Sequence, residues 1–531
     1  MNTKAAALPP GRKLSPTREE TLNGSGGNGS TDGQRSRPPA RLGELFRDTG
    51  AALVATAGSV TVEQVTVDSR KVQPGALFFA LHGAKADGNA FVAEAIARGA
   101  VAVASERAAP PDLPAGVAWV AIREARKSLA TVAANFYEHP ARALELVAVT
   151  GTNGKTTTTS LIDSIIKASG RKTGLFGTIA YHTPLGDYPA PNTTPESVDL
   201  QGFLAEIRDA GGSCAVLEAS SHSLMMDRLW GCHFQAAVFT NLTREHMDYH
   251  HTFEDYFAAK RRLFQGTGAG VPEVAVINSD DEWGQKLAGI ARKTLTYGLE
   301  SDADISTKTF QLGFGGLIFS AHTPNGRIQI ASPLVGRINV YNILASIGAA
   351  QALGIANEVI EEGVGNLQSV RGRFERVALG QPFLVIVDYA HTDDALRNLI
   401  LTARELTPKG RVITIFGCGG EKDRTKRPVM GEVAGRLSDL TILTNDNPRK
   451  EDPPRIISDV VVGLQKTNGK YLIEPDREKA IRMGVDEAAA GDIVLLAGKG
   501  HESEQILADR TIEWDDGEMA RRALREKGFG T

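Results

Sequence analysis

Short apolar runs alternate with segments of helical periodicity from residue 41 to the end of the chain. Seven of these runs are rich in Val, Ile and Leu, and each passes directly into a loop with Gly, Asn, Asp or His. They are LVAVT (146–150), CAVLEAS (214–220), AAVFTNL (236–242), FLVIVDYAH (383–391), RVITIFGCGG (411–420), LTILTNDNPR (440–449) and DIVLLAGKGHE (492–502). Nearly continuous apolar runs are typical of strands buried on both faces, as in parallel sheets covered by helices. The pattern therefore predicts an α/β fold with mostly parallel sheets.

Ligands of such sheets bind beyond the carboxyl ends of the strands. Because polar loops follow all of these runs, the sequence predicts a large site shared by two α/β domains. At roughly 150 residues per domain, the length suggests about three domains, which we place at residues 41–140, 141–370 and 371–531. Residues 1–40 are rich in Pro and Gly and poor in large apolar residues, which predicts a disordered tail.

Composition and charge narrow the class of protein. A formal net charge of −4 argues against a nucleic-acid-binding protein, which usually has a strong basic excess. Three scattered cysteines are too few for a disulfide framework or a cysteine-based zinc site. The N-terminus lacks the apolar stretch of a signal peptide, and no apolar run reaches the ~18 residues needed to cross a bilayer. We therefore expect a cytoplasmic protein that neither binds nucleic acid nor inserts into a membrane. We also expect a monomer, although nothing in the sequence reports the oligomeric state.

The clearest motif is GTNGKTT, which follows the run LVAVT and opens a helical pattern that ends at Gly170. Glycines in such a loop let backbone N–H groups surround phosphate oxygens, and the helix N-terminus adds positive potential. Lys155 is expected to reach the terminal phosphates and Thr156 to bind Mg²⁺. Val149 stands where the usual pattern has a glycine, so the loop is shorter than usual. The predicted phosphate-binding residues are Gly151, Thr152, Asn153, Gly154, Lys155, Thr156 and Thr157.

Further motifs follow along the chain. They are NTTP (192–195), EASSH (218–222), TNLTREHMDYH (240–250), DYFAAK (255–260), RGRFE (371–375), DYAHT (388–392), FGCGG (416–420), DNPR (446–449) and GKGHE (498–502). With the shortened phosphate loop, this set resembles the Mur ligases and the related folylpolyglutamate synthetases in order and spacing. The resemblance implies an N-terminal UDP-binding α/β domain, a central P-loop ATPase domain with a mostly parallel sheet, and a C-terminal Rossmann-like domain.

The resemblance also implies a reaction. An ATP-dependent ligase of peptidoglycan biosynthesis would add meso-2,6-diaminopimelate to UDP-N-acetylmuramoyl-L-alanyl-D-glutamate through an acyl phosphate. Catalysis would rest mainly on charge neutralisation and in-line positioning. The implied catalytic residues are Lys155, His246 and Lys260, and the implied Mg²⁺ ligands are Thr156, Glu218, His246 and a carbamylated Lys260 (N6-carboxylysine). The implied ATP contacts beyond the loop are Asn342, Arg373 and Asp388, with His391 as a further candidate.

The two other substrates have implied residues of their own. For the UDP-muramoyl-dipeptide these are Ser69, Thr193, Thr194, Ser220 and Arg228. For diaminopimelate they are Lys422, Asp446, Asn447, Pro448, Arg449, Gly498 and Glu502. Met226 and Lys422 depart from the family, in which some members have Gln and Arg, respectively. Lys422 keeps the charge but loses the planar fork, which predicts weaker binding of diaminopimelate.

Arg449 is the residue that points to diaminopimelate. This amino acid differs from lysine by a second carboxylate at the far end of its side chain, and the arginine fork matches a carboxylate with two parallel hydrogen bonds. Glu502 would accept the distal ammonium, and Gly498 would allow close backbone approach.

Three alternatives remain beside this interpretation. A lysine-adding ligase could use the same scaffold, although Arg449 argues against it. A P-loop NTPase acting as a switch or motor would leave the loops at 446–449 and 498–502 without a role. A nucleotide-sugar-binding regulator without catalysis would require degraded metal ligands, whereas Glu218, His246 and Lys260 are all present.

Overall fold

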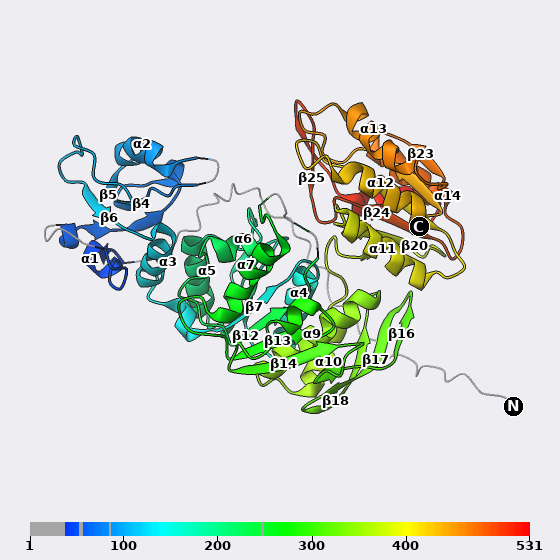
Figure 1. Cartoon of the computed structure of the whole chain (residues 1–531), viewed down its shortest axis with the longest axis horizontal. Coiled ribbons are helices and arrows are strands. Elements are labelled where there is room, and N and C mark those ends of the chain that lie inside the picture. Colours follow the sequence, from blue (N-terminus) through cyan, green and yellow to red (C-terminus); the bar gives the residue numbers. More distant parts are fainter. Residues whose placement is uncertain (1–37, 52–56, 84–85, 244, 246–248, 531) are drawn as a thin grey trace. The chain divides into compact units, whose positions relative to one another are not determined.

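The described part of the chain forms three large sheets, each packed against hydrophobic clusters, and two two-stranded sheets (Figure 1). The structure is a computed structural model that describes residues 38–51, 57–83, 86–243, 245 and 249–530, all within a single unit, residues 35–531. Regular structure begins with β1 (Ala40–Arg41), which pairs with β2 (Thr61–Val62). It therefore starts at the last residue of the predicted tail, one residue earlier than we expected.

The first sheet has four parallel strands in the order β3-β4-β5-β6. Its elements are β3 (Gln64–Thr66), β4 (Ala76–Phe79), β5 (Ala100–Ser105) and β6 (Ala118–Ala121), with α1 (Leu42–Leu45), α2 (Val92–Ala97) and α3 (Ala125–Phe136). Leu77 and Phe79 of β4 pack in the cluster that contains α1 and α3. Ala76 and Phe78 pack on the other side, with α2. Both faces of the sheet are thus buried, as the apolar composition of β4 predicts.

The central sheet has twelve strands in the order β10-β9-β8-β11-β7-β12-β13-β14-β15-β17-β16, with β18 beside β17. Its middle, from β8 to β15, is parallel, and antiparallel strands extend both ends. The strands are β7 (Glu145–Thr150), β8 (Thr173–Phe176), β9 (Tyr181–Thr183), β10 (Gly186–Tyr188), β11 (Cys214–Glu218), β12 (Ala236–Phe239), β13 (Val274–Asn278), β14 (Lys293–Gly298), β15 (Ile305–Ser306), β16 (Phe310–Gly313), β17 (Gly316–Thr323) and β18 (Gly326–Ser332).

Helices cover both faces of this sheet. They are α4 (Lys155–Ala168), α5 (Ser197–Asp209), α6 (Ser221–Met225), α7 (Phe253–Gln265), α8 (Glu282–Gln285), α9 (Arg337–Ala352) and α10 (Asn357–Asn366). Val147 and Val149 of β7 pack with α4, α9 and α10. Leu146 and Ala148 of the same strand pack with α5 and α7. The strand alternation therefore positions the phosphate loop between two buried layers.

The third sheet has six strands in the order β19-β20-β24-β21-β22-β23, all parallel except β19. These are β19 (Glu375–Val377), β20 (Leu384–Asp388), β21 (Val412–Phe416), β22 (Leu440–Leu443), β23 (Tyr471–Ile473) and β24 (Ile493–Ala497). One face packs against α11 (Asp393–Leu406), α12 (Lys426–Leu437) and α13 (Pro453–Leu464). The other packs against α14 (Arg477–Glu487) and α15 (Asp516–Glu526). A ribbon of β25 (Glu504–Ile506) and β26 (Thr511–Glu513) follows β24.

The fold class agrees with the prediction. Each of the seven apolar runs forms a strand, and these strands pair in parallel within the central and the third sheet. No described helix has the length and apolar character that a membrane span requires. The exact limits of the three domains stay a prediction.

Candidate active site

The phosphate-binding loop lies between β7 and α4, as predicted. Gly151 and Gly154 have φ angles of 146° and 86°, a region that side chains disfavour. A Cβ on Gly154 would lie 2.5 Å from Asn342 Oδ1, and one on Gly151 would clash with Thr240 Oγ1. Glycine is therefore required at both positions for the loop to pack this closely against its neighbours.

A cavity of about 680 Å³ opens beside this loop, at the carboxyl ends of β7, β11 and β12. It is lined by predicted residues from the central part of the chain and from the part that follows residue 370. These are Thr152, Asn153, Gly154, Lys155, Thr156, Thr157, Thr193, Glu218, Ser220, Lys260, Asn342, Arg373 and Asp388, together with His391. Motifs separated by more than 200 residues in sequence thus meet in one cavity.

Glu218 is a fully buried carboxylate at the end of β11. Its Oε1 accepts a hydrogen bond from the backbone N–H of Thr178 at 2.9 Å, and its Oε2 accepts one from the Thr178 hydroxyl at 3.2 Å. Thr156, at the first turn of α4, lines the same cavity. A carboxylate and a hydroxyl are oxygen donors of the type that Mg²⁺ prefers.

Lys260, on α7, has a side chain that is only 1% exposed. Its Nζ donates a hydrogen bond to the backbone oxygen of Gly151 at 2.7 Å and lies 4.5 Å from the centre of the Tyr256 ring. Burial lowers the pKa of Lys260 well below its ordinary value of 10.5, and the nearby Lys155 ammonium lowers it further. The amine is therefore neutral at neutral pH in a much larger fraction of molecules than a surface lysine would be.

Arg373 brings a cation to the phosphate loop from the third sheet. Its Nη2 donates to Thr156 Oγ1 at 3.4 Å, and its guanidinium lies 4.8 Å from the centre of the Tyr389 ring. Within the part of the chain that the structure describes, its buried Nε has no hydrogen-bond partner. A buried donor of this kind, at a cavity wall, is suited to an anionic ligand.

Asp388 ends β20 at the same wall of the cavity. Its two carboxylate oxygens accept the backbone N–H groups of Phe374 at 2.7 Å and Ala390 at 2.8 Å. Burial raises the pKa of Asp388, and the charge of Arg373 opposes that effect. For His391, which is a cation when protonated, burial has the opposite effect and lowers the pKa, and the Lys426 ammonium lowers it further.

The residues predicted for the UDP-muramoyl-dipeptide do not all line the cavity. Thr193 and Ser220 line the cavity, whereas Thr194 is fully buried and its hydroxyl donates to the backbone oxygen of Glu218 at 2.6 Å. Arg228 donates to the backbone oxygen of Thr194 at 2.8 Å. Ser69 belongs to the first sheet region, where its hydroxyl donates to Glu94 at 3.2 Å. His246 falls outside the described residues.

The residues predicted for diaminopimelate come together after β21, β22 and β24. Asn447 Nδ2 donates to Glu502 Oε2 at 2.8 Å, which joins the DNPR and GKGHE loops. Arg449 Nη1 donates to the backbone oxygen of Gly420 at 3.0 Å. A Cβ added to Gly498 would lie 2.9 Å from Asp446 Oδ2, and one added to Gly419 would lie 3.2 Å from Arg449 Nη1 and 3.8 Å from Lys422 Cγ, so these glycines leave the loops little space for a side chain. The ring of Tyr389, which lines the cavity, packs on His501 with ring centres 4.8 Å apart, so these loops adjoin the cavity.

Sequence reasoning missed Asp280 and Tyr341 on the cavity wall. Asp280 accepts the Tyr341 hydroxyl at 2.8 Å and the backbone N–H groups of Leu299 and Ser301 at 2.6 and 2.8 Å. Burial raises the pKa of Asp280, but hydrogen bonds from the Ser301 side chain, the backbone of Glu300 and Leu299, and Tyr341 lower it to about 2. The signal was present, because the apolar run at 274–278 ends in Ser-Asp-Asp like the other strands.

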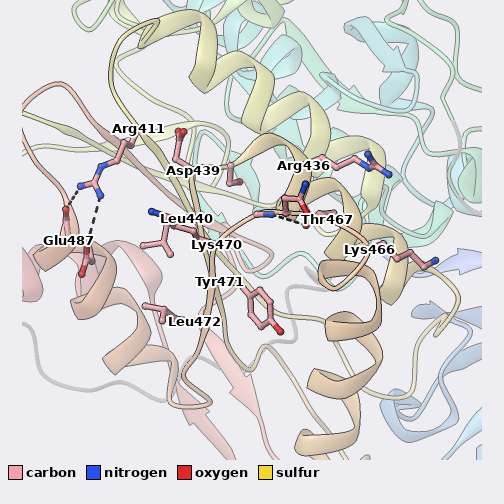
Figure 2. A pocket seen from close by; sticks show the side chains of 14 residues that line it. Arg411, Arg436, Asp439, Leu440, Lys466, Thr467, Lys470, Tyr471, Leu472 and Glu487 are labelled. Atoms are coloured by element: carbon pink, nitrogen blue, oxygen red, sulfur yellow. Dashed lines mark hydrogen bonds and ion pairs between the residues drawn. The ribbon is translucent and has the colours of Figure 1, made fainter.

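A second cavity, of about 880 Å³, lies at the amino ends of β21, β22 and β23 (Figure 2). Arg411 at its edge donates to Asp492 at 2.9 Å and to the backbone oxygen of Glu487, and Asp439 pairs with Arg404 at 2.5 Å. No residue predicted for the site lines it. Ligands of parallel sheets bind at the opposite strand ends, so this cavity is not part of the candidate site.

Among the described residues, no group of three His, Cys, Asp or Glu side chains could hold a metal ion.

Comparisons with known proteins agree with the motifs. Three family models match: "Mur ligase family, catalytic domain" at residues 61–137, "Mur ligase middle domain" at 149–350 and "Mur ligase, glutamate ligase domain" at 372–500.

Curated relatives are similar over most of their length. A protein of Solibacter usitatus named UDP-N-acetylmuramoyl-L-alanyl-D-glutamate–2,6-diaminopimelate ligase is 51% identical over 88% of this chain and 94% of its own. A Geobacillus kaustophilus protein of the same name is 44% identical over 89% and 96%. A solved structure with that name matches with a TM-score of 0.66 and 33% identity, covering 92% of this chain and 99% of the other.

Proposed function

The chain belongs to the Mur ligase family, and we infer from its site that it adds meso-2,6-diaminopimelate to UDP-N-acetylmuramoyl-L-alanyl-D-glutamate with ATP as the energy source. It is an ATP-dependent, peptide-bond-forming ligase of peptidoglycan biosynthesis. The observation that carries this conclusion is the junction of Asn447 with Glu502 beside Arg449, next to a cavity lined by a phosphate loop. This junction supports the proposal because Arg449 would bind a carboxylate and Glu502 an ammonium, next to a loop that would bind a triphosphate.

The first chemical step follows from the cations of the cavity. A carboxylate oxygen of the dipeptide attacks the γ-phosphorus of ATP, and the bond from that phosphorus to the bridging oxygen breaks, which leaves ADP and an acyl phosphate. Lys155 and Arg373 would neutralise the charge that both anions bring together. The amine of diaminopimelate then attacks the acyl carbon, phosphate leaves, and the amine loses a proton.

We propose Thr156, Glu218 and His246 as Mg²⁺ ligands. The buried carboxylate of Glu218 and the hydroxyl of Thr156 on one cavity wall support this assignment, because both supply hard oxygen donors. A bound Mg²⁺ would offset negative charge on the phosphates.

Lys260 is proposed to be carbamylated. Its neutral amine would add CO₂ and lose a proton, giving an N-carboxylate. The depressed pKa and the position near Lys155 support this proposal, since the Lys155 ammonium disfavours a second cation at this buried position and would attract an N-carboxylate there.

For the two other substrates the proposed residues are those predicted from the sequence. Arg449 and Lys422 would bind the distal carboxylate of diaminopimelate and Glu502 its distal ammonium, with Asp446, Asn447, Pro448 and Gly498 completing the site. Thr193, Thr194, Ser220 and Arg228 would hold the muramoyl-dipeptide, and Ser69 the uridine end. We also propose that the protein acts as a monomer in the cytoplasm, where nucleotide substrates are found.

Phosphate release with UDP-N-acetylmuramoyl-L-alanyl-D-glutamate and ATP tests this function. We expect release with meso-diaminopimelate, much less with lysine, and none after chelation with EDTA until Mg²⁺ is added in excess. Equal turnover with both amines would contradict the specificity, and release without any amine would favour a nucleotide hydrolase.

A further inference from the structure

Lys499, in the GKGHE loop, is a fully buried lysine outside the residues assigned so far. Its Nζ donates a hydrogen bond to Asn447 Oδ1 at 2.9 Å and another to Glu502 Oε2 at 3.1 Å. Burying an ammonium is unfavourable unless it is paired and hydrogen-bonded. Both requirements are met here, because the ammonium has a carboxylate partner and two hydrogen bonds.

The contact determines how Glu502 is oriented. Its Oε2 accepts hydrogen bonds from both Lys499 and Asn447 Nδ2, the latter at 2.8 Å. Among the described residues no donor is bound to its Oε1, and the Glu502 side chain is 32% exposed. One carboxylate oxygen is thus held by the protein, and the other is presented for a ligand.

The same lysine fixes the spacing between the two loops. Asn447 Oδ1 accepts the backbone N–H of Ile506 at 3.0 Å in addition to Lys499. Asn447 lies two residues before Arg449, whose own backbone N–H donates to Ile506 at 3.1 Å. These hydrogen bonds, which include those of Lys499, join the two loops and thereby set the distance between Arg449 and Glu502.

A fully buried ion pair interacts with the charges of Lys499 and Glu502. In this pair Arg477 Nη2 donates to Asp516 Oδ2 at 2.5 Å. Burial lowers the pKa of Arg477, whereas the carboxylates of Asp516, Asp446 and Glu502 raise it. Glu502 thus belongs to a network of buried charges that extends beyond its own loop.

We propose that Lys499 is a positioning residue that holds Glu502 for the distal ammonium of the amino-acid substrate. It thereby selects amino acids whose far end carries an amine as well as a carboxylate. This inference rests on the proposed function, because it takes diaminopimelate as the substrate.

The test compares Lys499→Met with the matched control Lys470→Met, which alters an exposed lysine of the same part of the chain. Phosphate release is measured with meso-diaminopimelate and with 2-aminopimelate, which keeps the distal carboxylate but lacks the distal amine. For Lys499→Met we expect kcat/KM for diaminopimelate to fall by about tenfold or more, mainly through KM, as expected for one charge-assisted hydrogen bond. The value for 2-aminopimelate and the KM for ATP should change little, so the selectivity collapses, whereas Lys470→Met should match the wild type.

If Lys499→Met lowered kcat/KM by the same factor for diaminopimelate and 2-aminopimelate, the selectivity would be unchanged and the proposal would be overturned. Thermal unfolding shows whether Lys499→Met folds. If it does not, Lys499→Arg is measured instead. Lys499→Arg keeps the positive charge, so it should preserve the preference for diaminopimelate, and a loss of that preference would contradict the role of the charge. A wild-type protein that releases no phosphate with diaminopimelate would instead refute the proposed function.

Discussion

Replacing Arg449 by lysine tests the basis of amino-acid selection most directly. Arg449 Nη1 is engaged by the backbone oxygens of Gly420 at 3.0 Å and Asn447 at 3.4 Å, so the rest of the guanidinium edge is available for a carboxylate. Lysine keeps the positive charge but cannot form two parallel hydrogen bonds. It also keeps the left-handed backbone of this position, φ 53°, which disfavours both side chains alike.

The size of the effect follows from the bond that is lost. One hydrogen bond to a charged group contributes about 1.5–3 kcal/mol, which corresponds to a decrease of roughly 10- to 150-fold in kcat/KM for diaminopimelate. Lysine as substrate has no distal carboxylate, so its poor turnover should change little. The ratio of the two amines should therefore fall by the same factor, while the KM for ATP stays constant.

Phosphate release with each amine in turn measures this ratio. Arg455→Lys, which alters an exposed arginine on α13, is the matched control and should behave as the wild type. If Arg449→Lys lowered turnover equally with both amines, the carboxylate role would be refuted, and a loss of ATP binding in parallel would indicate damaged folding.

Four further changes test other parts of the site and of the fold. Lys260→Ala should abolish phosphate release, and added short-chain carboxylic acids should partly restore it; unaffected activity would exclude the carbamate. Gly151→Ala places a Cβ against a threonine hydroxyl at φ 146° and should raise the KM for ATP strongly. Gly170→Ala meets no atom within 4 Å at φ 78°, so it should keep ATP binding and lose only about 1–2 kcal/mol of unfolding free energy in a urea titration. Asp516→Asn leaves Arg477 buried without its partner and should cost about 3–5 kcal/mol in the same titration. The pKa of Asp516 is below 3.8 in the folded state, so the ionised carboxylate contributes to the free energy of unfolding above pH 3.8. This contribution is lost as the pH falls through the folded pKa. The difference in stability between the wild type and Asp516→Asn should therefore become smaller in acid.

The strands and the phosphate loop could be predicted because their signals are local. The run at 146–150 needs only its own apolar residues to indicate a buried strand, and GTNGKTT carries its strand, loop and helix in adjacent positions. Assigning roles to Arg449 and Lys260 needed the family resemblance, since taken alone DNPR resembles an Asn-Pro turn after a strand and Lys260 resembles a solvated lysine on a helix. For Lys260, the structure adds a physical reason: the side chain is 1% exposed and lies beside a second lysine.

The residues that sequence reasoning missed depend on tertiary contacts. Asp280 is held by backbone groups about twenty residues away and by Tyr341, sixty-one residues away. Lys499 reads as a flexible lysine between two glycines until its Nζ is seen to join Asn447 with Glu502. No periodicity in the sequence reports such a pairing, because hydrogen bonds between loops leave no repeat.

The net charge of the chain makes these local arrangements necessary. A protein with a formal charge of −4 does not attract anions such as ATP or a UDP-sugar by its overall charge, and at physiological salt exposed charges are screened beyond roughly 8 Å. Binding must therefore come from cations inside the cavity and the adjoining loops. Lys155 and Arg373 are placed at the phosphate loop and Arg449 at the amino-acid loops, each beside a backbone or hydroxyl oxygen that fixes its direction. The geometry of these cations, more than the total charge, then decides which anion is bound. For this reason Arg449→Lys should change the selectivity between amino acids although the charge is conserved.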